Sequence, residues 1–235
     1  MNKLDNKNLK VAIVVADKDE YIHIENMFSD CLIADNIGSL LGHKFNLKGN
    51  NRNINVKTIC SGIGKVDAAA ATALLGPDYD LIVNIGLSGG FEGSKKHDII
   101  IGDKFYEHDF DLTGIGYALG QKPGQPLCIN ADEKYLNDII TKYPFVKKGA
   151  FVTGDSFVCS KEQHDLLKEK FAPIACAMES AAVGYAASLL NIPFISLRMV
   201  SDGADDSSAD NYTETLYGAN ADSYVKLLFD WLKTL

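Results

Sequence analysis

Hydrophobic runs alternate with amphipathic stretches along the whole chain. Apolar, β-branched runs bounded by turn residues predict buried strands at residues 9–16, 56–60, 79–85, 149–152, 174–178 and 192–200. Helical spacing of apolar positions predicts helices at residues 20–28, 65–75, 132–142, 161–168, 179–190 and 216–235. Residues 30–60 favour irregular or antiparallel structure with a hairpin tip at 49–53, and residues 103–127 have the glycine and proline content of a long loop.

This alternation predicts the fold class. Strands that alternate with helices favour an α/β protein built as a three-layer α/β/α sandwich around a mostly parallel or mixed central sheet. The sequence contains no internal repeat, low-complexity tract or linker. A chain of 235 residues is within the range of one α/β domain, so we expect residues 1–235 to form a single domain.

Composition narrows the classes of partner. The hydrophobic content of 46% supports one large core, and the formal net charge of −8 argues against binding to a nucleic-acid backbone. The five cysteines are scattered without a CxxC pair, which is typical of reduced thiols rather than of a disulfide framework or a zinc site. The polar first ten residues lack the apolar core of a signal peptide, and no apolar run is long enough to span a bilayer. We therefore expect a soluble, cytoplasmic protein without a membrane partner.

The apolar run at residues 192–200 ends abruptly at Ser201 and Asp202. Ligands of open α/β sheets bind just outside the carboxyl ends of such strands, so these two residues and Arg198 are candidates for a site. A carboxylate in this position is either a proton donor or a turn-former. Glycine-rich segments at 62–64 and 86–90 follow two other predicted strands. Neither has the spacing of a Walker or dinucleotide loop, and each alone is equally consistent with a tight turn.

Other polar residues carry two interpretations each. Glu179 and Glu20 are either ordinary acids near helix starts or carboxylates that handle a ligand, since a carboxylate can accept two hydrogen bonds from a vicinal diol. His108, Asp109 and Asp111 are residue types that bind metal ions. The sequence has no second His, Asp or Glu cluster with the spacing that would complete a metal site, so we expect none. Taken singly, the aromatic residues Phe157, Tyr117 and Tyr212 favour core or surface positions. We expect no nucleophilic Ser-His-Asp arrangement.

Several ordered motifs together are far more specific than any one of them. They are Ser61-Gly-Ile-Gly-Lys-Val66, Asn84-Ile-Gly-Leu-Ser-Gly-Gly90, residues 106–124 with His-Asp-x-Asp and Gly-Gln-x-Pro-Gly, Gly154-Asp-Ser-Phe-Val158, Met178-Glu179 and Arg198-Met-Val-Ser-Asp202. In this combination the chain resembles the purine nucleoside phosphorylase/uridine phosphorylase superfamily. It is most similar to the hydrolytic branch, the 5′-methylthioadenosine/S-adenosylhomocysteine nucleosidases. The resemblance covers nearly the whole chain and implies a nucleoside phosphorylase-like fold, a small-molecule nucleoside substrate, no cofactor and a homodimer.

The resemblance implies roles for the polar candidates. Asp202 would protonate N7 of the departing purine, which requires the carboxyl to hold a proton at working pH, and Ser201 would orient it. General acid help of this kind contributes roughly 10²–10⁴-fold to a rate. Glu20, with Arg198 nearby, would position and activate the attacking water. Glu179 would grip the ribose hydroxyls.

The resemblance also implies the walls of the substrate site. Phe157 would stack on the base, the backbone of Val158 would contact the adenine edge, and Met178 would pack under the sugar. Tyr212 would close over the 5′ substituent from its own chain. An apolar 5′ tail would meet residues supplied across a dimer interface, namely Leu112, Ile115 and Pro123. The remaining substrate-binding positions that the resemblance implies are Ala16, Ile63, Ser88, Gly89, Ala204 and Tyr117.

The choice of nucleophile follows from charge. Phosphorolytic relatives gather arginines near the glycine-rich loop, whereas the matching positions here are Glu20 and Asn84, so we expect water rather than phosphate to attack. The sequence departs from the nucleosidase pattern at Leu87 (usually Ser), Ala177 (usually Glu), Asp17 and Ile115. The leading hypothesis is a 5′-thioadenosine nucleosidase of a methionine-salvage type. The alternatives are a phosphate-dependent purine nucleoside phosphorylase and a nucleoside-binding protein with weakened catalysis.

Overall fold

A computed structural model describes residues 8–235, and residues 1–7 of the polar amino-terminal segment lie outside the described part. The strands are β1 (Leu9–Val15), β2 (Ile33–Ala34), β3 (Gly42–Lys48), β4 (Asn53–Cys60), β5 (Leu81–Gly90), β6 (Ile99–Glu107), β7 (Ile129–Asn130), β8 (Lys147–Thr153), β9 (Ala175–Ala177) and β10 (Phe194–Asp202). The helices are α1 (Lys18–Phe28), α2 (Lys65–Leu75), the 3₁₀ turn η1 (Thr113–Ile115), α3 (Glu133–Lys142), α4 (Lys161–Phe171), α5 (Ser180–Leu189), α6 (Ser208–Leu216) and α7 (Ser223–Lys233). Within residues 8–235, no helix has both the length and the apolar character needed to cross a membrane.

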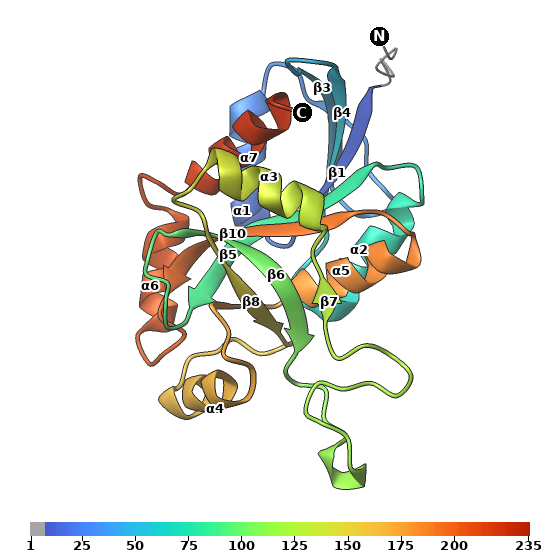
Figure 1. Ribbon diagram of the computed structural model, residues 1–235. Helices are drawn as coiled ribbons and strands as arrows, with labels where there is room; N and C mark the ends of the chain where they lie inside the picture. The colour runs from blue at the N-terminus through green and yellow to red at the C-terminus, as the bar shows by residue number, and fades with distance from the viewer. Residues whose placement is uncertain (1–7) are drawn as a thin grey trace.

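All the strands belong to one mixed sheet (Figure 1). β1 pairs in parallel with β4 and β5, and β5 pairs in parallel with β10. β10 continues antiparallel to β6, β6 pairs with β8, β8 with β9, and β9 returns to β5. Five strands, β5, β10, β6, β8 and β9, therefore form a closed ring. Strands β1, β4, β3 and β2 extend the sheet from β5. The predicted hairpin tip at 49–53 is confirmed between β3 and β4.

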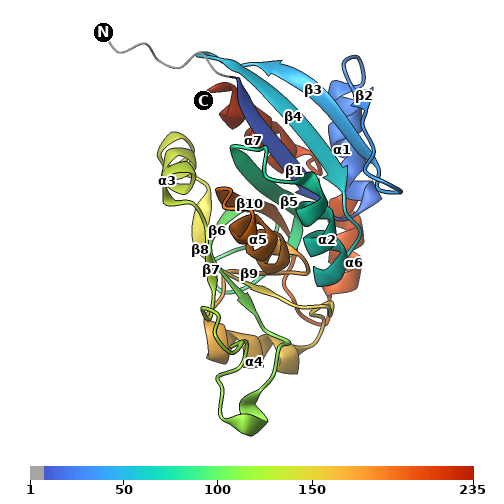
Figure 2. The same ribbon diagram turned by 90° about the vertical axis from the view of Figure 1, so that its right-hand side faces the viewer.

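Helices cover the sheet on two sides (Figure 2). Residues of α1, α3 and α7 share one apolar cluster with β1, β5 and β10. Residues of α2 and α5 share a second cluster on the other side of the sheet. A small third cluster lies under α4. These layers confirm the predicted three-layer α/β/α architecture with a mixed central sheet.

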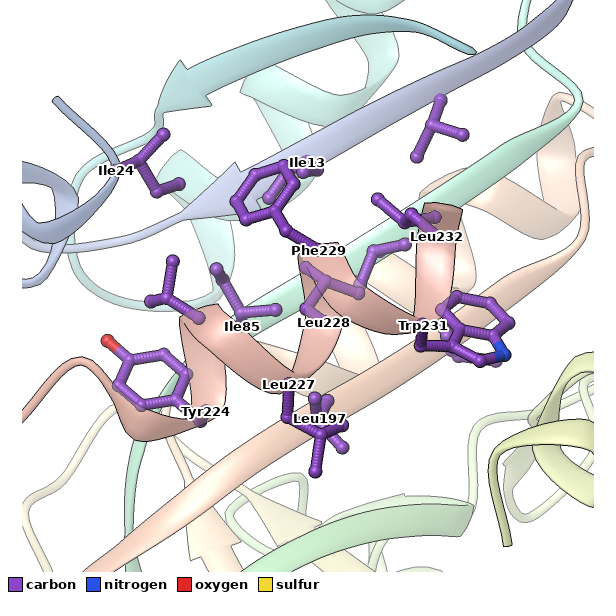
Figure 3. Packing of buried hydrophobic residues seen from close by; sticks show 14 of the residues in the cluster. Ile13, Ile24, Ile85, Leu197, Tyr224, Leu227, Leu228, Phe229, Trp231 and Leu232 are labelled. Atoms are coloured by element: carbon purple, nitrogen blue, oxygen red, sulfur yellow. The ribbon is translucent and has the colours of Figure 1, made fainter. Parts of the chain in front are cut away.

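Helix α7 packs over the middle of the sheet (Figure 3). Apolar side chains of α7, among them Leu228 and Trp231, lie over Ile13 of β1, Ile85 of β5 and Leu197 of β10. All five of these side chains are fully buried. Burial of each such side chain contributes roughly 1.5–3 kcal/mol relative to exposure. This contact holds the strands whose carboxyl ends carry the polar residues.

Two predicted strand ends are wrong. The segment 86–90 is not a turn but the last half of β5, and Ser201 and Asp202 are the last two residues of β10. β5 continues through its glycines because it hydrogen-bonds to β10 on one side and to β9 on the other. The sequence pattern did not predict the last residues of these strands, because the run of apolar residues stops before the backbone pairing does.

Two further predictions are wrong in part. Residues 103–107, expected as loop, belong to β6, where a register irregularity between Gly102 and Lys104 breaks the apolar pattern. The helix expected at 216–235 begins later, since α7 starts at Ser223, and α6, which ends at Leu216, was not predicted. Between them, Gly218 lies in a turn that its N–H closes on the Thr215 carbonyl.

Candidate active site

A cavity of about 390 Å³ opens at the carboxyl ends of β1, β4, β5 and β10. This is the edge of the sheet at which α/β proteins bind ligands. Most of the sequence-predicted site residues meet in its wall, namely Ala16, Glu20, Ile63, Ser88, Gly89, Phe157, Val158, Met178, Glu179, Arg198, Ser201, Asp202 and Tyr212. Ala204 lies directly behind it, because its N–H donates to Asp202. Leu112, Ile115, Tyr117 and Pro123 are not among the residues of the described chain that line it.

Asp202 is almost completely buried, and a donor lies within reach of each of its carboxyl oxygens. The Ser201 hydroxyl is 2.6 Å from Oδ2 and also lies 3.1 Å from the Ser88 carbonyl oxygen. Oδ1 accepts a hydrogen bond of 2.9 Å from the N–H of Ala204, whose backbone is left-handed with φ of 51°. Asp202 therefore does form a turn, since an aspartate that binds the N–H two residues on is an Asx-turn. That turn fixes the carboxyl in the cavity wall, so the two interpretations of Asp202 are compatible.

Glu20 reaches the cavity from the first turn of α1, which Asp17 caps through the N–H of Asp19. Oε1 of Glu20 accepts a hydrogen bond of 2.7 Å from the Leu87 N–H, and Oε2 is buried without a partner among the described residues. Burial raises the pKa of Glu20 to about 8, although the positive charge of Arg198 acts in the opposite direction. Burial raises a carboxyl pKa because the charged form loses its hydration.

Gly86 provides the space between Glu20 and Arg198. A Cβ atom at this position would lie 2.6 Å from Glu20 Oε2 and 2.7 Å from Arg198 Nη1. Both distances are shorter than real carbon contacts, so any side chain would displace the carboxylate or the guanidinium. The glycine inside β5 is thus explained by the close approach of two functional side chains, which is one reason for glycine in a strand interior.

Arg198 is buried, and both of its terminal nitrogens are engaged. Nη2 donates to Asn84 Oδ1 at 2.6 Å and to Glu179 Oε2 at 3.0 Å, and Nη1 donates to the Leu87 carbonyl at 3.0 Å. Leu87 therefore hydrogen-bonds to Glu20 with its backbone N–H and to Arg198 with its backbone C=O. The replacement of the usual serine at this position leaves both of these contacts intact.

Glu179 occupies the N-cap position of α5, yet its side chain makes no hydrogen bond to that helix. Its Oε1 accepts a bond of 3.2 Å from the N–H of Gly64, and its Oε2 binds Arg198. Gly64 has φ of 97°, a conformation that favours glycine. The glycine turn before α2 thus serves both as a strand-to-helix turn and as a donor to the carboxylate. The contacts of Glu179 favour the ligand-handling interpretation over that of a simple helix-start acid.

Aromatic side chains form the outer wall. The rings of Phe157 and Tyr212 meet edge to face with centroids 6.0 Å apart. Phe157 remains 42% exposed, so its face is available at the cavity mouth, whereas Val158 beside it is buried. Tyr212 comes from α6, a helix that the sequence pattern did not predict. Its side chain lines the cavity.

Some lining residues escaped the sequence reasoning, namely His108, Ser156, Cys176, Ala209 and Thr213. Ala209 and Thr213 lie one turn apart on α6 on the same face as Tyr212, so a correct prediction of α6 would have indicated them. Burial lowers the pKa of His108 and raises that of Cys176 to about 12. Both side chains are therefore neutral near pH 7 and serve as wall rather than as charge.

The His-Asp-x-Asp motif has partners of its own. Asp109 accepts from Lys65 Nζ at 2.5 Å and from the Asp155 N–H at 2.9 Å, and Asp111 accepts from the Thr113 N–H. Within residues 8–235, no group of three or more His, Cys, Asp or Glu side chains could hold a metal ion. Asp109 therefore links the start of α2 to the loop that carries Phe157.

The segment after β6 explains the four predicted residues outside the cavity wall. Residues 108–124, with η1 among them, extend away from the body of the molecule (Figures 1 and 2). Ile115 is 71% exposed, and Leu112 and Tyr117 are half-buried. Their place on this projecting segment is why none of the four lines the cavity of this chain.

Comparison with known proteins agrees with this geometry. The family model of the phosphorylase superfamily matches residues 10–235. A 5′-methylthioadenosine/S-adenosylhomocysteine nucleosidase of an Exiguobacterium species is 33% identical over 92% of this chain and 94% of its own length. The Neisseria meningitidis nucleosidase in complex with methylthio-immucillin-A is 31% identical, with a TM-score of 0.86 over 96% of this chain and 99% of its own. A futalosine hydrolase mutant of Helicobacter pylori is 25% identical, with a TM-score of 0.87 over 97% of this chain and 100% of its own.

The match is therefore not confined to the fold. It extends over nearly the full length of both chains, and the sequence identity to the nucleosidases exceeds 30% for the Exiguobacterium and Neisseria proteins. The chain belongs to the phosphorylase superfamily and, within it, to the family of the 5′-methylthioadenosine/S-adenosylhomocysteine nucleosidases.

Proposed function

We propose that this chain hydrolyses the N-glycosidic bond of adenosines that carry a 5′-thio substituent, such as 5′-methylthioadenosine and S-adenosylhomocysteine. The products are adenine and the 5′-thio-substituted ribose. The observation that carries this proposal is that the buried residues Glu20, Glu179, Asp202 and Arg198 meet in the wall of one cavity. The names and the bound inhibitor of the relatives support the same substrate class.

Asp202 acts on the leaving group. Cleavage of the bond builds negative charge on the departing purine, and a proton delivered to N7 neutralises it. A general acid must lie within hydrogen-bond reach of its target, and a carboxyl held from both oxygens keeps one orientation. The Ser201 hydroxyl and the Ala204 N–H supply that hold.

Glu20 and Glu179 act on the other half of the bond. Glu20 presents the unpartnered Oε2 beside Arg198 and accepts a proton from the attacking water. Glu179 holds the ribose hydroxyls, oriented from behind by Gly64 and Arg198. The positive charge that develops on the ribose is stabilised by these carboxylates, because they lie in a site of low effective dielectric.

Charge favours water over phosphate as the nucleophile. The residues that line the cavity include four acidic residues, Asp17, Glu20, Glu179 and Asp202, against one arginine, and Glu20 and Glu179 act in their ionised form. The two terminal nitrogens of Arg198 already donate to Asn84, Glu179 and Leu87. Two like unit charges about 4 Å apart cost about 4 kcal/mol at an effective dielectric near 20. A phosphate dianion would meet that repulsion from each ionised carboxylate.

The direct experiment incubates the purified chain with 5′-methylthioadenosine in phosphate-free buffer and follows adenine by chromatography. We expect adenine release at a rate that does not depend on added phosphate. Ribose 1-phosphate as a product, formed at a rate that rises with phosphate, would instead assign the chain to the phosphorylases. Binding of the nucleoside without adenine release would assign it to the nucleoside-binding class.

A substrate panel tests the 5′ group. The outer wall at Phe157 and Tyr212 is aromatic, which favours an apolar thioether over a bare hydroxyl. We expect kcat/KM to be higher for 5′-methylthioadenosine and S-adenosylhomocysteine than for adenosine. Futalosine belongs in the panel because one structural relative is a futalosine hydrolase. A preference for futalosine would leave the hydrolytic mechanism in place and overturn the proposed substrate.

We further propose a single-domain, cytoplasmic enzyme of methionine salvage that works as a homodimer. The exposed Ile115, with Leu112 and Pro123 on the same projecting loop, supports a second copy, because these side chains would then complete the 5′ end of the partner's cavity. The five free cysteines support a reducing compartment. Light scattering tests the dimer, and a stable, fully active monomer would contradict it.

A further inference from the structure

We propose that Asn84 is a positioning residue for this reaction, because its carboxamide oxygen holds the guanidinium of Arg198 at the cavity wall. The inference rests on the proposed function. Asn84 lies in the middle of β5 and is fully buried. It does not line the cavity, so any effect on catalysis must pass through another residue.

The orientation of the Asn84 side chain is fixed by its neighbours. Nδ2 lies 3.2 Å from the carbonyl oxygen of Val14 on β1, and a carbonyl can only accept a hydrogen bond. The atom that faces Val14 is therefore the nitrogen, and the oxygen must face the opposite way. On that side Arg198 Nη2 approaches to 2.6 Å, and a guanidinium can only donate. The two contacts agree on one amide orientation.

A pair of serines supports the same oxygen. The Ser180 and Ser196 hydroxyls lie 3.0 and 3.1 Å from Asn84 Oδ1 and 3.0 Å from each other. Both serines are fully buried, and they come from α5 and β10 respectively. The carboxamide is thus held from three elements, so its oxygen cannot move without leaving buried donors unpaired, which costs about 1–3 kcal/mol for each group.

This support determines where Arg198 lies. Nη2 is shared between Asn84, which is neutral, and Glu179, which is charged. A neutral acceptor holds the guanidinium without cancelling its charge, so the charge remains available to Glu179 and Glu20. If the acceptor were absent, Arg198 would be held at Nη2 by Glu179 alone and would follow that carboxylate. Asn84 therefore keeps Arg198 in place while Glu179 handles the ribose.

The first test replaces Asn84 by Leu, which has nearly the same shape but no acceptor. We expect kcat for 5′-methylthioadenosine to fall roughly 10- to 100-fold, the range that loss of a hydrogen bond to a charged group represents, with little change in KM. The matched control is Thr72→Val, because Thr72 is also fully buried and hydrogen-bonded but bonds only to Ala68 within α2. The control should lose stability without losing kcat.

The second test replaces Asn84 by Asp, which adds a charge at constant shape. The groups that face Glu20 are Arg198, Glu179, Asp17 and the phenols of Tyr212 and Tyr224. One more carboxylate beside Arg198 offsets its positive charge and raises the pKa of Glu20 further. We expect the acid limb of the kcat/KM profile to move up by about one pH unit. An unmoved limb would mean that position 84 does not act on Glu20 through Arg198.

The outcomes separate the inference from the proposed function. If the wild-type chain releases no adenine, both fail. If it does, but Asn84→Leu retains its kcat or Asn84→Asp leaves the acid limb unmoved, only the inference fails. Should neither variant fold, Ser196→Ala decides, since it removes one donor to the same oxygen at little cost in packing. We then expect kcat to fall about 5-fold, as for one neutral hydrogen bond, and a kcat equal to that of Thr72→Val overturns the inference.

Discussion

The two faces of β10 are buried to the same degree but are built on different principles. On one face Ile195, Leu197 and Met199 belong to the apolar cluster beneath α7. On the other face, between Phe194 and Val200 of the second apolar cluster, Ser196 and Arg198 belong to the hydrogen-bonded group around Asn84. Apolar burial is non-directional and roughly proportional to area, whereas a buried polar group is stable only when each of its atoms finds a partner. The apolar face therefore tolerates changes of shape, and the polar face tolerates few changes of any kind.

The largest loss of activity is expected from a change at Asp202, the last residue of β10. Asp202→Asn keeps the shape of the side chain and a hydrogen-bond acceptor but removes the acidic proton. We expect turnover of 5′-methylthioadenosine to fall by about 10²–10⁴-fold, with binding of a substrate analogue largely intact. Steady-state kinetics and calorimetric titration measure the two quantities. Retained turnover would remove Asp202 from the acid role and make it a turn-former only.

Glu20→Gln tests how much a buried carboxyl group of the site reduces the stability of the fold. The pKa of Glu20 is raised from 4.5 to about 8, so from pH 4.5 upward the unfolded chain ionises while the folded chain keeps its proton. Wild-type stability is therefore lost progressively as the pH rises from about 4.5 to 8. A glutamine carries no such penalty and should gain about 4 kcal/mol relative to wild type between pH 4.5 and pH 8. Urea unfolding at the two pH values measures this gain, and an equal gap at both would contradict it.

The same variant should lose most of its turnover, because it removes the group that accepts the proton of water. In the wild-type enzyme kcat/KM should rise with pH through about 8, as Glu20 ionises. A variant that is more stable but inactive is the expected signature of a group buried for function rather than for folding.

Glu179→Gln compares two substrates on the polar side. The change weakens the hold on the ribose hydroxyls and removes a buried ionic partner of Arg198. We expect kcat/KM to fall roughly 10- to 100-fold for ribosyl substrates and less for the 2′-deoxy analogue. Parallel assays of 5′-methylthioadenosine and its 2′-deoxy form give the ratio. Equal losses on both would argue that Glu179 is only a helix-start acid.

Ile195→Val should have the smallest effect, and it serves as the control on the apolar face of β10. Removal of one buried methylene in a core costs about 0.5–1.5 kcal/mol. We expect that loss in urea unfolding, with kcat unchanged, although the neighbouring residue Ser196 supports the carboxamide of Asn84. A lower kcat would mean that the two faces of β10 are coupled.

The sequence was sufficient for the architecture and for most of the cavity wall. Apolar runs located the strands because burial on both faces leaves a continuous hydrophobic pattern, as at Leu81–Ile85. The same logic failed at Gly86–Gly90 and Ser201–Asp202, where strand pairing continues through residues that have no apolar signal. Those segments are where the site lies, so the pattern is weakest at the positions that carry the chemistry.

The partners of the polar residues could not be predicted from the sequence. Glu20 and Arg198 were expected to work together. Their side chains approach each other across Gly86, and each also hydrogen-bonds to the backbone of Leu87. Likewise, Glu179 is joined to Arg198 and Gly64 across three separate elements. Such contacts depend on side-chain rotamers and on the register between strands, and neither is encoded in local spacing.

The backbone contacts of Leu87 have a consequence for natural variation and for engineering. Both of its hydrogen bonds to catalytic groups come from the backbone. The side chain at this position can therefore change without loss of these hydrogen bonds. Leu87 also lines the cavity, so its side chain alters the volume and polarity offered to a ligand. A small library at position 87 is therefore a direct route to altered ligand preference on an unchanged catalytic framework.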